Sequence, residues 1–291
     1  MQVRFLRGPL SSQRAERLFS SGIGSLPEQM SGELASVDGQ ILLAAEATIP
    51  ATDDGLLRGD GAFEVLRLYG GRPFAGEEHL LRLAASAKNI QLDFDDASLR
   101  AEIDALLAEH GERDGCLRIV LTRGGIRLLL TEPLPERGTS VTLGAVTYQP
   151  SIVLDGVKSL SYAANMMAGR LAVDRGFDEA LLVTPEGAVL EAPTATLFWV
   201  EGTKVFTPPL ADRILESITR RHIVDLTAAS EMSVDLAELL ERADEAFLAS
   251  TTREIQSVSA IESLKLPENG PVTAELAGQL HDRVTAELAS N

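Results

Sequence analysis

The segment 158–199 contains a basic and an acidic residue whose sequence neighbours are mostly apolar. Lys158 lies in the mostly apolar run 157–162, and Glu191 ends the apolar return strand 188–191. A lysine that can lose its proton forms a Schiff base with an aldehyde, and an acid can pair with a pyridinium nitrogen so that the ring withdraws electrons. These are the two groups that pyridoxal phosphate chemistry requires of a protein.

A simpler interpretation of the same two residues also fits them. Lysine and glutamate side chains are mostly exposed in folded proteins. A lysine ahead of a helix and a glutamate at a strand end are therefore usually solvated charges. These two residues alone do not decide between the two interpretations. The decision depends on the motifs around them.

Apolar periodicity and turn residues predict the elements that position these side chains. A strand pair is expected over 37–47, broken by the turn dipeptide Asp38-Gly39. The predicted helices cover 77–90, 96–110, 163–172 and 217–230, with a final helix after Gly270-Pro271, and the predicted strands cover 116–122, 141–147, 178–183 and 244–248. Residues 178–191 form a hairpin in this interpretation, which brings Glu191 back toward the protein interior.

Composition limits the class of protein and its partners. The chain has 291 residues, an apolar content of 45% and a formal net charge of −17, which argues against binding to nucleic acid or to an anionic membrane surface. One cysteine, Cys116, excludes an internal disulfide, and four scattered histidines give no metal-ligand spacing. No apolar run reaches the length of a membrane span. We therefore expect a cytoplasmic protein without a metal site.

Several short motifs follow one another along the chain around Lys158 and Glu191. They are Arg58-Gly59-Asp60-Gly61-Ala62-Phe63-Glu64, His79-Leu80-Leu81-Arg82-Leu83, Lys158-Ser159-Leu160-Ser161-Tyr162, Glu191-Ala192-Pro193-Thr194, Ile214-Leu215-Glu216-Ser217-Ile218-Thr219-Arg220 and Ser250-Thr251-Thr252-Arg253. In this order they resemble the class IV (fold type IV) pyridoxal-phosphate-dependent aminotransferases. That family includes branched-chain aminotransferases, D-amino acid transaminases, (R)-amine transaminases and aminodeoxychorismate lyases.

The resemblance implies an α/β (α+β) protein of two domains, with pyridoxal 5'-phosphate between them and a homodimer as the assembly. The smaller N-terminal α/β domain would cover residues 31–130, and the larger, β-barrel-like C-terminal domain with helices would cover 140–291. The Gly- and Pro-containing segment 131–139 has the composition of an interdomain linker. Residues 1–30 are expected to be an N-terminal extension whose composition permits disorder.

The resemblance also implies roles for individual residues. Lys158 would be the catalytic Schiff-base lysine and proton carrier, and Glu191 would keep the pyridine nitrogen protonated. The residues expected to bind the cofactor are Arg58, Lys158, Tyr162, Glu191, Leu215, Ile218, Thr219 and Thr251. Those expected to bind the substrate are Phe63, Arg118, Arg123 and Thr252. For His79 and Arg82, one helical turn apart, we expect a structural network rather than catalysis.

Two of these sites can be argued from local structure as well. Ser217 is a good N-cap, and the free N–H groups at a helix start suit a phosphate; the family usually has glycine at this position. Arg118 and Arg123 are an odd number of residues apart, so a regular strand directs them to opposite faces. At most one of them can enter the site from an unbroken strand.

The reaction expected from the resemblance is transfer of an amino group from an amino acid or primary amine to a 2-oxo acid. An aminodeoxychorismate lyase, which releases pyruvate and 4-aminobenzoate, is the alternative, and a non-catalytic ligand-binding relative is a third. The segments Thr122-Arg123-Gly124 and 250–255 resemble D-amino acid and (R)-amine enzymes, whereas 158–166 resembles bacterial lyases. Cys116-Leu117-Arg118 stands where branched-chain enzymes have Tyr-x-Arg.

Overall fold

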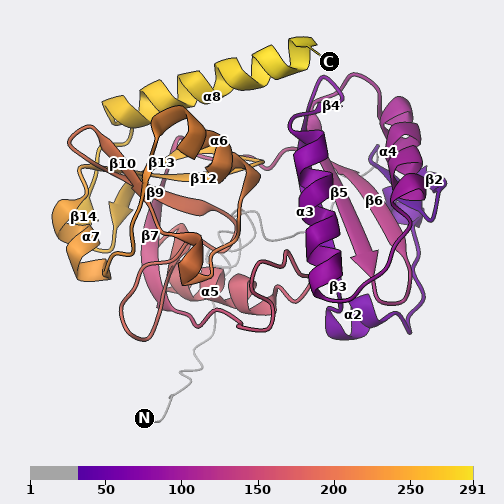
Figure 1. The fold of residues 1–291 in the computed structure, drawn as a ribbon, viewed down its shortest axis with the longest axis horizontal. Helices are drawn as coiled ribbons and strands as arrows, with labels where there is room; N and C mark the ends of the chain where they lie inside the picture. The colour runs from indigo at the N-terminus through magenta and orange to yellow at the C-terminus, as the bar shows by residue number, and fades with distance from the viewer. Residues whose placement is uncertain (1–31, 291) are drawn as a thin grey trace.

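A computed structural model describes residues 32–290 of the chain and builds them around two β-sheets that lie beside one another (Figure 1). The expectation for residues 1–30 lies outside the described residues. The mixed α/β fold that the resemblance implies is confirmed, and the structure shows that its strands form two sheets. The interdomain boundary stays a prediction, but the connection that it concerns, residues 133–139, runs between the last strand of one sheet and the first strand of the other.

The N-terminal sheet has six strands, all paired in antiparallel fashion. In spatial order they are β2 (Gln40–Leu43), β1 (Leu34–Val37), β6 (Arg127–Glu132), β5 (Gly115–Thr122), β3 (Gly61–Tyr69) and β4 (Arg72–Pro73). The helices of this half are α2 (Asp54–Arg58), α3 (Gly76–Asn89) and α4 (Asp96–His110), with a 3-10 turn, η2, at Ala44–Glu46. The predicted strand pair about Asp38-Gly39 is thus the hairpin β1–β2, and the predicted helix over 96–110 is α4.

Strand β3 divides its side chains between two environments. Ala62, Leu66 and Leu68 point to one face and are buried with apolar side chains of α3 and α4. Glu64 belongs to the same face because side chains alternate along a strand. Phe63 and Val65, on the opposite face, line a cavity. One strand therefore supplies both the core of the N-terminal half and a wall of the cavity.

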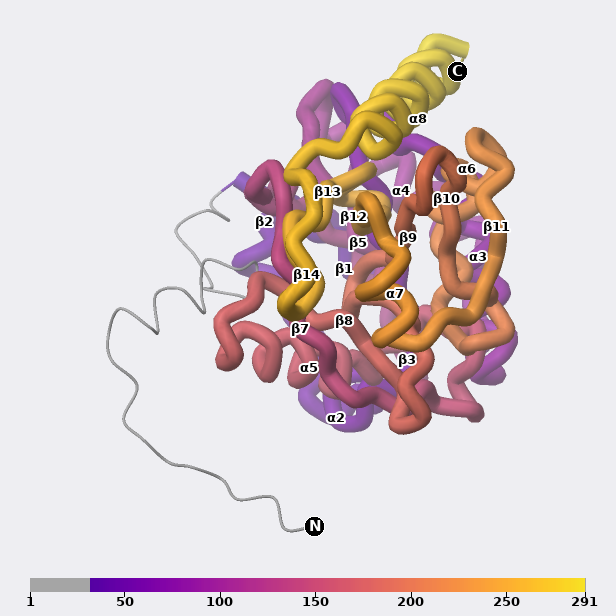
Figure 2. Tube along the Cα trace, turned by 90° about the vertical axis from the view of Figure 1, so that its left-hand side faces the viewer, coloured from indigo at the N-terminus to yellow at the C-terminus, as the bar shows by residue number. Residues whose placement is uncertain are grey.

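The C-terminal sheet has eight strands and mixed pairing. In spatial order they are β11 (Ser230–Glu231), β10 (Lys204–Thr207), β9 (Thr196–Glu201), β12 (Glu245–Ser250), β13 (Glu254–Ile261), β7 (Ser140–Thr147) and β8 (Glu179–Val183), with β14 (Leu264–Lys265) paired to β13. Figure 2 shows β7 and β13, far apart in the sequence, side by side, and these two strands pair in parallel. Parallel pairing of β7 with β8 requires a crossover, which contains α5 (Ala163–Asp174).

The central strands of this sheet are covered on both faces. Leu197 and Trp199 of β9 pack in one apolar cluster, and Phe198 packs in another, where its ring stacks on Phe247 at a centroid distance of 5.0 Å. The remaining helices are α6 (Ile218–Thr227), α7 (Leu236–Arg242) and α8 (Pro271–Ser290), with a 3-10 turn, η3, at Leu210–Asp212. Burial on both faces explains why β9 reads as a continuous apolar run rather than an alternating one.

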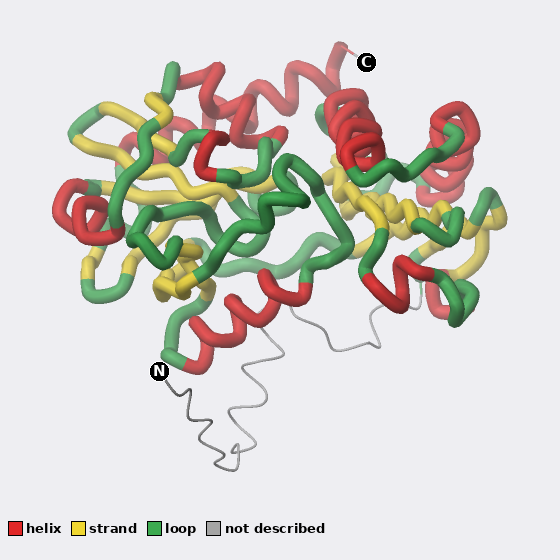
Figure 3. Tube along the Cα trace, turned by 60° about the horizontal axis from the view of Figure 1, so that its bottom comes forward, coloured by secondary structure: helices red, strands yellow, loops and turns green. Residues whose placement is uncertain are grey.

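Loops, not strands, occupy the space between the two sheets (Figure 3). Because backbone that leaves a sheet carries polar groups and turn residues, such a region is where functional side chains gather. In the part of the chain that the structure describes, no helix combines the length and the apolar character needed to cross a lipid bilayer. No cluster of three or more His, Cys, Asp or Glu side chains with metal-binding geometry occurs within residues 32–290.

Candidate active site

A cavity of about 390 Å³ lies between the two sheets. Its walls come from β3 and β5 on one side and, on the other, from residues 158–173, 191–196, 215–217 and 250–253. Eight of the residues predicted for the cofactor or the substrate line it: Phe63, Arg118, Lys158, Tyr162, Glu191, Leu215, Thr251 and Thr252. The structure therefore brings together residues that are separated by up to 189 positions in the sequence.

Lys158 is held against the start of β3 by backbone pairing. Its carbonyl accepts a hydrogen bond from the Phe63 amide at 3.0 Å, its own amide donates to Ser86 Oγ at 3.1 Å, and Ser159 forms a β-bridge with Ala62. The ammonium group lies 4.3 Å from the centre of the Phe63 ring and 5.9 Å from that of Tyr162. The lysine thus projects from an extended segment into an aromatic corner of the cavity.

The environment of Lys158 favours its neutral form. Withdrawal from bulk water and the nearby positive charge of Arg82 lower its pKa to about 8, against the usual 10.5, although Glu64 and Glu191 oppose this effect. A fraction of the amine is therefore unprotonated near neutral pH. An amine of this kind can act as a nucleophile toward an aldehyde and can carry a proton.

Glu191 reaches the cavity by way of a hairpin. Backbone hydrogen bonds join Leu182 to both Leu190 and Glu191, and Thr184 to Ala188, so the chain returns beside β8 as predicted. One carboxylate oxygen accepts a hydrogen bond from the Leu215 amide at 3.1 Å. Withdrawal from water raises the pKa of Glu191 to about 7, although the Leu215 amide and Lys158 lower it. The group keeps unused acceptor capacity on its cavity side.

Tyr162 closes the corner between these two residues. Its ring meets Phe63 edge to face at 5.4 Å, and its hydroxyl donates to the Pro193 carbonyl at 2.8 Å. Asn165 donates to the same carbonyl at 3.2 Å. The phenol oxygen is thereby oriented and can still accept a hydrogen bond from, or exchange its proton with, a group in the cavity.

The four other predicted residues do not line this cavity. Arg58 lies at the end of α2 with an exposed guanidinium that pairs with Asp54. Arg123 pairs with Asp60 and donates to the carbonyls of Ile90 and Gln91. Ile218 and Thr219 line a smaller cavity, which is described below. Arg118, on β5, lines the cavity, whereas Arg123 lies beyond the end of β5, so strand parity does not determine its direction.

Arg82 takes the cationic position that the sequence suggested for Arg58. Its Nε and Nη2 atoms donate to Glu64 at 2.6 and 2.8 Å, its Nη1 atom donates to the Glu216 carbonyl at 2.9 Å, and the residue lines the large cavity. His79 Nδ1 donates to Glu64 at 2.9 Å. The predicted network of His79 and Arg82 thus exists, with Glu64 at its centre. Sequence reasoning missed that the same arginine also reaches the cavity.

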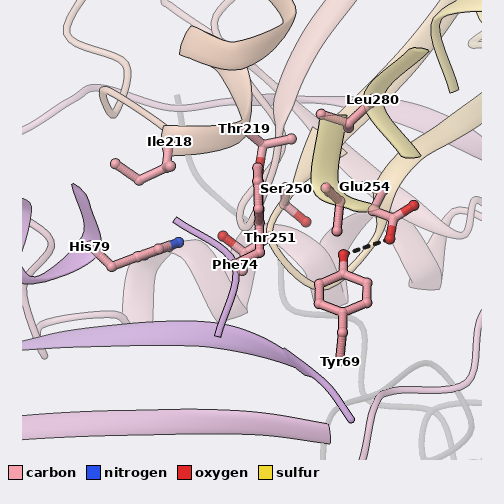
Figure 4. Close-up of a pocket in the computed structure, with 10 residues that line it drawn as sticks. Tyr69, Phe74, His79, Ile218, Thr219, Ser250, Thr251, Glu254 and Leu280 are labelled. Atoms are coloured by element: carbon pink, nitrogen blue, oxygen red, sulfur yellow. Dashed lines mark hydrogen bonds between the residues drawn. The ribbon is translucent and has the colours of Figure 1, made fainter. Parts of the chain in front are cut away.

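The start of α6 presents backbone donors near this arginine. Ser217 is the N-cap, and its hydroxyl accepts from the Arg220 amide at 3.3 Å. The amides of Ile218 and Thr219 are the first two N–H groups of the helix, which have no acceptor within it. Figure 4 shows Thr219 close to Ser250 and Thr251 around a cavity of about 10 Å³, and Thr251 lines the large cavity as well. Helix amides, a hydroxyl and a guanidinium are the donor set that suits a phosphate dianion.

These groups fit pyridoxal phosphate in number and chemical type. Lys158 and Glu191 are the amine and the acid that it needs, and Arg82, the start of α6 and Thr251 can bind its phosphate. Leu215, whose amide is held by Glu191, supplies an apolar side chain in the same wall. The anion donors, the amine and the acid that the cofactor needs therefore belong to one region between the two sheets.

Several further charged residues of the cavity wall were not predicted. Arg137 lies on the segment between the sheets, and Arg253 and Glu179 form an ion pair at 3.0 Å beside it. Residue type alone could not identify them, because the predicted linker 131–139 and the turn 250–253 carry no periodicity that tells which side chain points inward. Their positions follow from the way in which the two sheets come together.

Comparison with known proteins agrees with this geometry. Residues 61–261 match the model of the amino-transferase class IV family. The chain is 29% identical to the D-alanine aminotransferase of Bacillus licheniformis, covering 87% of this chain and 97% of that protein. It is 28% identical to the aminodeoxychorismate lyase of Bacillus subtilis, covering 82% and 91%.

Solved structures agree as well. The fold IV transaminase CpuTA1 of Curtobacterium pusillum superimposes with a TM-score of 0.75 at 25% identity, over 84% of this chain and 98% of that one. The family match includes strands of both sheets and every residue that lines the large cavity, from Gly61 to Ile261. The protein belongs to the class IV aminotransferase family and has its two-sheet, fold type IV architecture.

Proposed function

We propose that the protein is a pyridoxal-phosphate-dependent aminotransferase that moves an amino group between an amino acid or primary amine and a 2-oxo acid. The observation that carries the proposal is the shared cavity of Lys158 and Glu191, where the lysine has a lowered pKa and the glutamate a raised one. Such a pair of perturbed groups in one cavity is typical of a catalytic site. Membership of a pyridoxal-phosphate-dependent family supports the same conclusion.

When bound, pyridoxal phosphate supplies an aldehyde that condenses with amines and a ring that withdraws electrons from the neighbouring carbon. Lys158 would provide the amine that holds the aldehyde and, once free, would carry a proton at Nζ. Glu191 would accept a hydrogen bond from the ring nitrogen and so keep it protonated. Tyr162 would orient the ring hydroxyl through its own phenol group.

The phosphate would be bound beside the start of α6. We assign it to Arg82, to the amides of Ile218 and Thr219 and to the hydroxyl of Thr251, whereas Arg58 has no part because its side chain lies outside the cavity. Leu215 would contact the face of the ring. The homodimer expected from the sequence belongs to the same proposal and rests on the resemblance alone.

Lys158→Ala tests this assignment directly. Wild-type protein incubated with pyridoxal phosphate should gain a visible absorption band, and reduction with borohydride should leave the cofactor attached to the peptide that contains Lys158. The variant should show neither change, and its amino-group transfer should fall by at least about 1000-fold, because nucleophile and proton carrier are lost together. If the variant turns over like the wild type, or the cofactor is attached elsewhere, the central assignment fails.

An aminodeoxychorismate lyase is the second candidate, and the relative in Bacillus subtilis favours it. The two reactions use the same amine, acid and phosphate groups, so the cavity described above serves either. Release of pyruvate from aminodeoxychorismate without a 2-oxo acid acceptor would indicate the lyase. Conversion of a D- or L-amino acid only when an acceptor is present would indicate the aminotransferase. A ligand-binding relative without catalysis would give neither product.

A further inference from the structure

Besides Arg82, three guanidinium groups line the cavity, and two of them are already neutralised by the protein. Arg118 makes a two-pronged ion pair with Glu132, at 2.8 and 2.9 Å. Arg253, which is buried, pairs in the same way with Glu179, at 3.0 and 3.2 Å, and also donates to Gln256. Forked pairing uses the geometry in which a guanidinium would bind a substrate carboxylate. Neither residue is therefore ready to bind an anion without losing its partner.

Arg137 differs from both of them. Within residues 32–290 no carboxylate lies within 4.0 Å of its guanidinium, and its one side-chain hydrogen bond goes from Nη2 to Thr252 Oγ1 at 3.2 Å. A guanidinium has five N–H donors. Most of the donors of Arg137 therefore have no acceptor within the described residues, and the side chain lines the cavity.

The position of Arg137 is defined by its neighbours although the residue lies on a connecting segment. Gln256 donates from Nε2 to the Gly138 carbonyl at 2.8 Å, which ties the segment to β13. On the other side, the turn that carries Thr252 is closed by the hydrogen bond from the Arg253 amide to the Ser250 carbonyl at 3.2 Å. Arg137 and Thr252 can thus both donate to a ligand. The segment that carries Arg137 is fixed by Gln256 of β13, and Thr252 lies in the turn between β12 and β13.

The charge around Arg137 is mixed, because Glu132, Glu136, Asp178 and Glu179 line the same cavity. Partial withdrawal from water and the positive charge of Arg253 nevertheless lower the pKa of Arg137 to about 10, although Glu179 opposes this effect. The group stays protonated at neutral pH, but its charge is destabilised there. A bound anion would relieve that destabilisation, since an opposite charge favours the charged form.

We propose that Arg137, together with the Thr252 hydroxyl, binds the carboxylate of the substrate. The inference rests on the proposed function and gives its substrate class: molecules that carry a carboxylate group, rather than simple amines and aldehydes. It replaces the sequence-based assignment of the substrate to Arg118 and Arg123, whose guanidinium groups are held by Glu132 and by Asp60. Because Arg137 lies on the segment between the sheets, substrate recognition and the arrangement of the two sheets are linked.

The test uses the pyridoxal-phosphate-loaded enzyme and maleate, a dicarboxylate that has neither an amino nor an oxo group to react. Binding is measured by calorimetry for the wild type, Arg137→Gln and Arg137→Lys. Loss of a charge-assisted hydrogen bond should weaken maleate binding by about 10- to 100-fold in Arg137→Gln. Arg137→Lys, which keeps the charge and loses the fork, should lie between this variant and the wild type.

Arg242→Gln is the matched control, because Arg242, at the end of α7, pairs with Glu201 of β9 away from the cavity, and its loss should leave maleate binding unchanged. Should Arg137→Gln fail to fold in a thermal melt, Arg137→Lys carries the test. Maleate binding by Arg137→Gln within about twofold of the wild type overturns the inference, as does a wild type that binds no maleate. Failure of the proposed function is seen separately, as absence of cofactor attachment to Lys158.

Discussion

The interior of the N-terminal half and the wall of the cavity each hold a carboxylate that is withdrawn from bulk water. Glu64 is fully buried on β3, and Arg82 and His79 donate three hydrogen bonds to it. Glu191 accepts one backbone hydrogen bond, from Leu215. Their pKa values move in opposite directions for this reason. Burial alone would raise the pKa of Glu64, but Arg82 and His79 lower it to about 2, whereas burial raises that of Glu191 to about 7.

The contrast separates two uses of a buried acid. A carboxylate whose lone pairs are filled by protein donors fixes the positions of those donors, and here it fixes Arg82 at the edge of the cavity. A buried carboxylate with unused acceptor positions has lost hydrogen bonds to water that the protein does not replace. A ligand that donates a hydrogen bond to it therefore stabilises its charged form. Glu64 therefore positions Arg82 without contacting a ligand itself, and Glu191 is available to accept a hydrogen bond from a ligand in the cavity.

The largest change is expected from Glu64→Gln in the protein without cofactor. Removing the charge leaves Arg82 without its ionic partner in a site with little water, which should lower the free energy of unfolding by about 3 kcal/mol. Urea denaturation measures the loss. Glu77→Gln is the control, because Glu77, on α3 like Arg82, is an exposed partner of Arg100 on α4 and should change stability by less than about 1 kcal/mol. Equal losses in the two variants would show that the cluster does not stabilise the fold.

Glu191→Gln should have the opposite profile. A neutral amide cannot balance the charge of a protonated ring nitrogen, so the turnover of the loaded enzyme should fall by about 100-fold. The free energy of unfolding of the cofactor-free protein should not fall at neutral pH, because no ion pair is broken and the amide avoids the cost of a charge withdrawn from water. Steady-state kinetics and urea denaturation give the two values. A large loss of stability with unchanged turnover would reverse the roles assigned to Glu64 and Glu191.

The pH dependence of stability tests the difference between Glu64 and Glu191 through a smaller effect. The free energy of unfolding should change by at most about 1.4 kcal/mol per pH unit for each group. The stability that Glu64 contributes is complete above its ordinary pKa of 4.5 and is lost as the pH falls toward about 2. For Glu191 the folded-state pKa is raised, so its contribution is complete below 4.5 and is lost as the pH rises from 4.5 to about 7. The difference in unfolding free energy between wild type and each variant should therefore have slopes of opposite sign, and slopes of the same sign would contradict the contrast.

Much of the secondary structure could be predicted because it depends on local patterns. The helix over 96–110 has an Asp95 cap, an apolar face and a terminal Gly111, and the structure confirms its bounds. The hairpin at Asp38-Gly39 likewise follows from a turn dipeptide with positive φ at both residues. Strand β6 lacked such a signal: Arg127–Glu132 lies between a Gly-Gly turn and a Pro-rich segment, and its place beside β5 and β1 is decided by pairing.

Among the site residues, the sequence could name chemical types but not partners. Arg58 and Arg82 are equally cationic, and only the packing of α3 against β3 shows that Glu64 directs Arg82 toward the cavity while Arg58 stays with Asp54 at the surface. The same is true of Arg118 and Arg137, since pairing with Glu132 uses one guanidinium and leaves the other open. Which charge is neutralised depends on contacts across strands and between sheets.

The sequence by itself determined most of the elements and singled out Lys158 and Glu191 as candidates, because side-chain periodicity and the combination of these two residues with their neighbouring motifs are properties of short segments. Only the tertiary structure decided which arginines remain available for phosphate and carboxylate. Electrostatic interactions depend on distance in space and on removal from water, and both arise when strands that are distant in the sequence, such as β3 and β12, meet around one cavity.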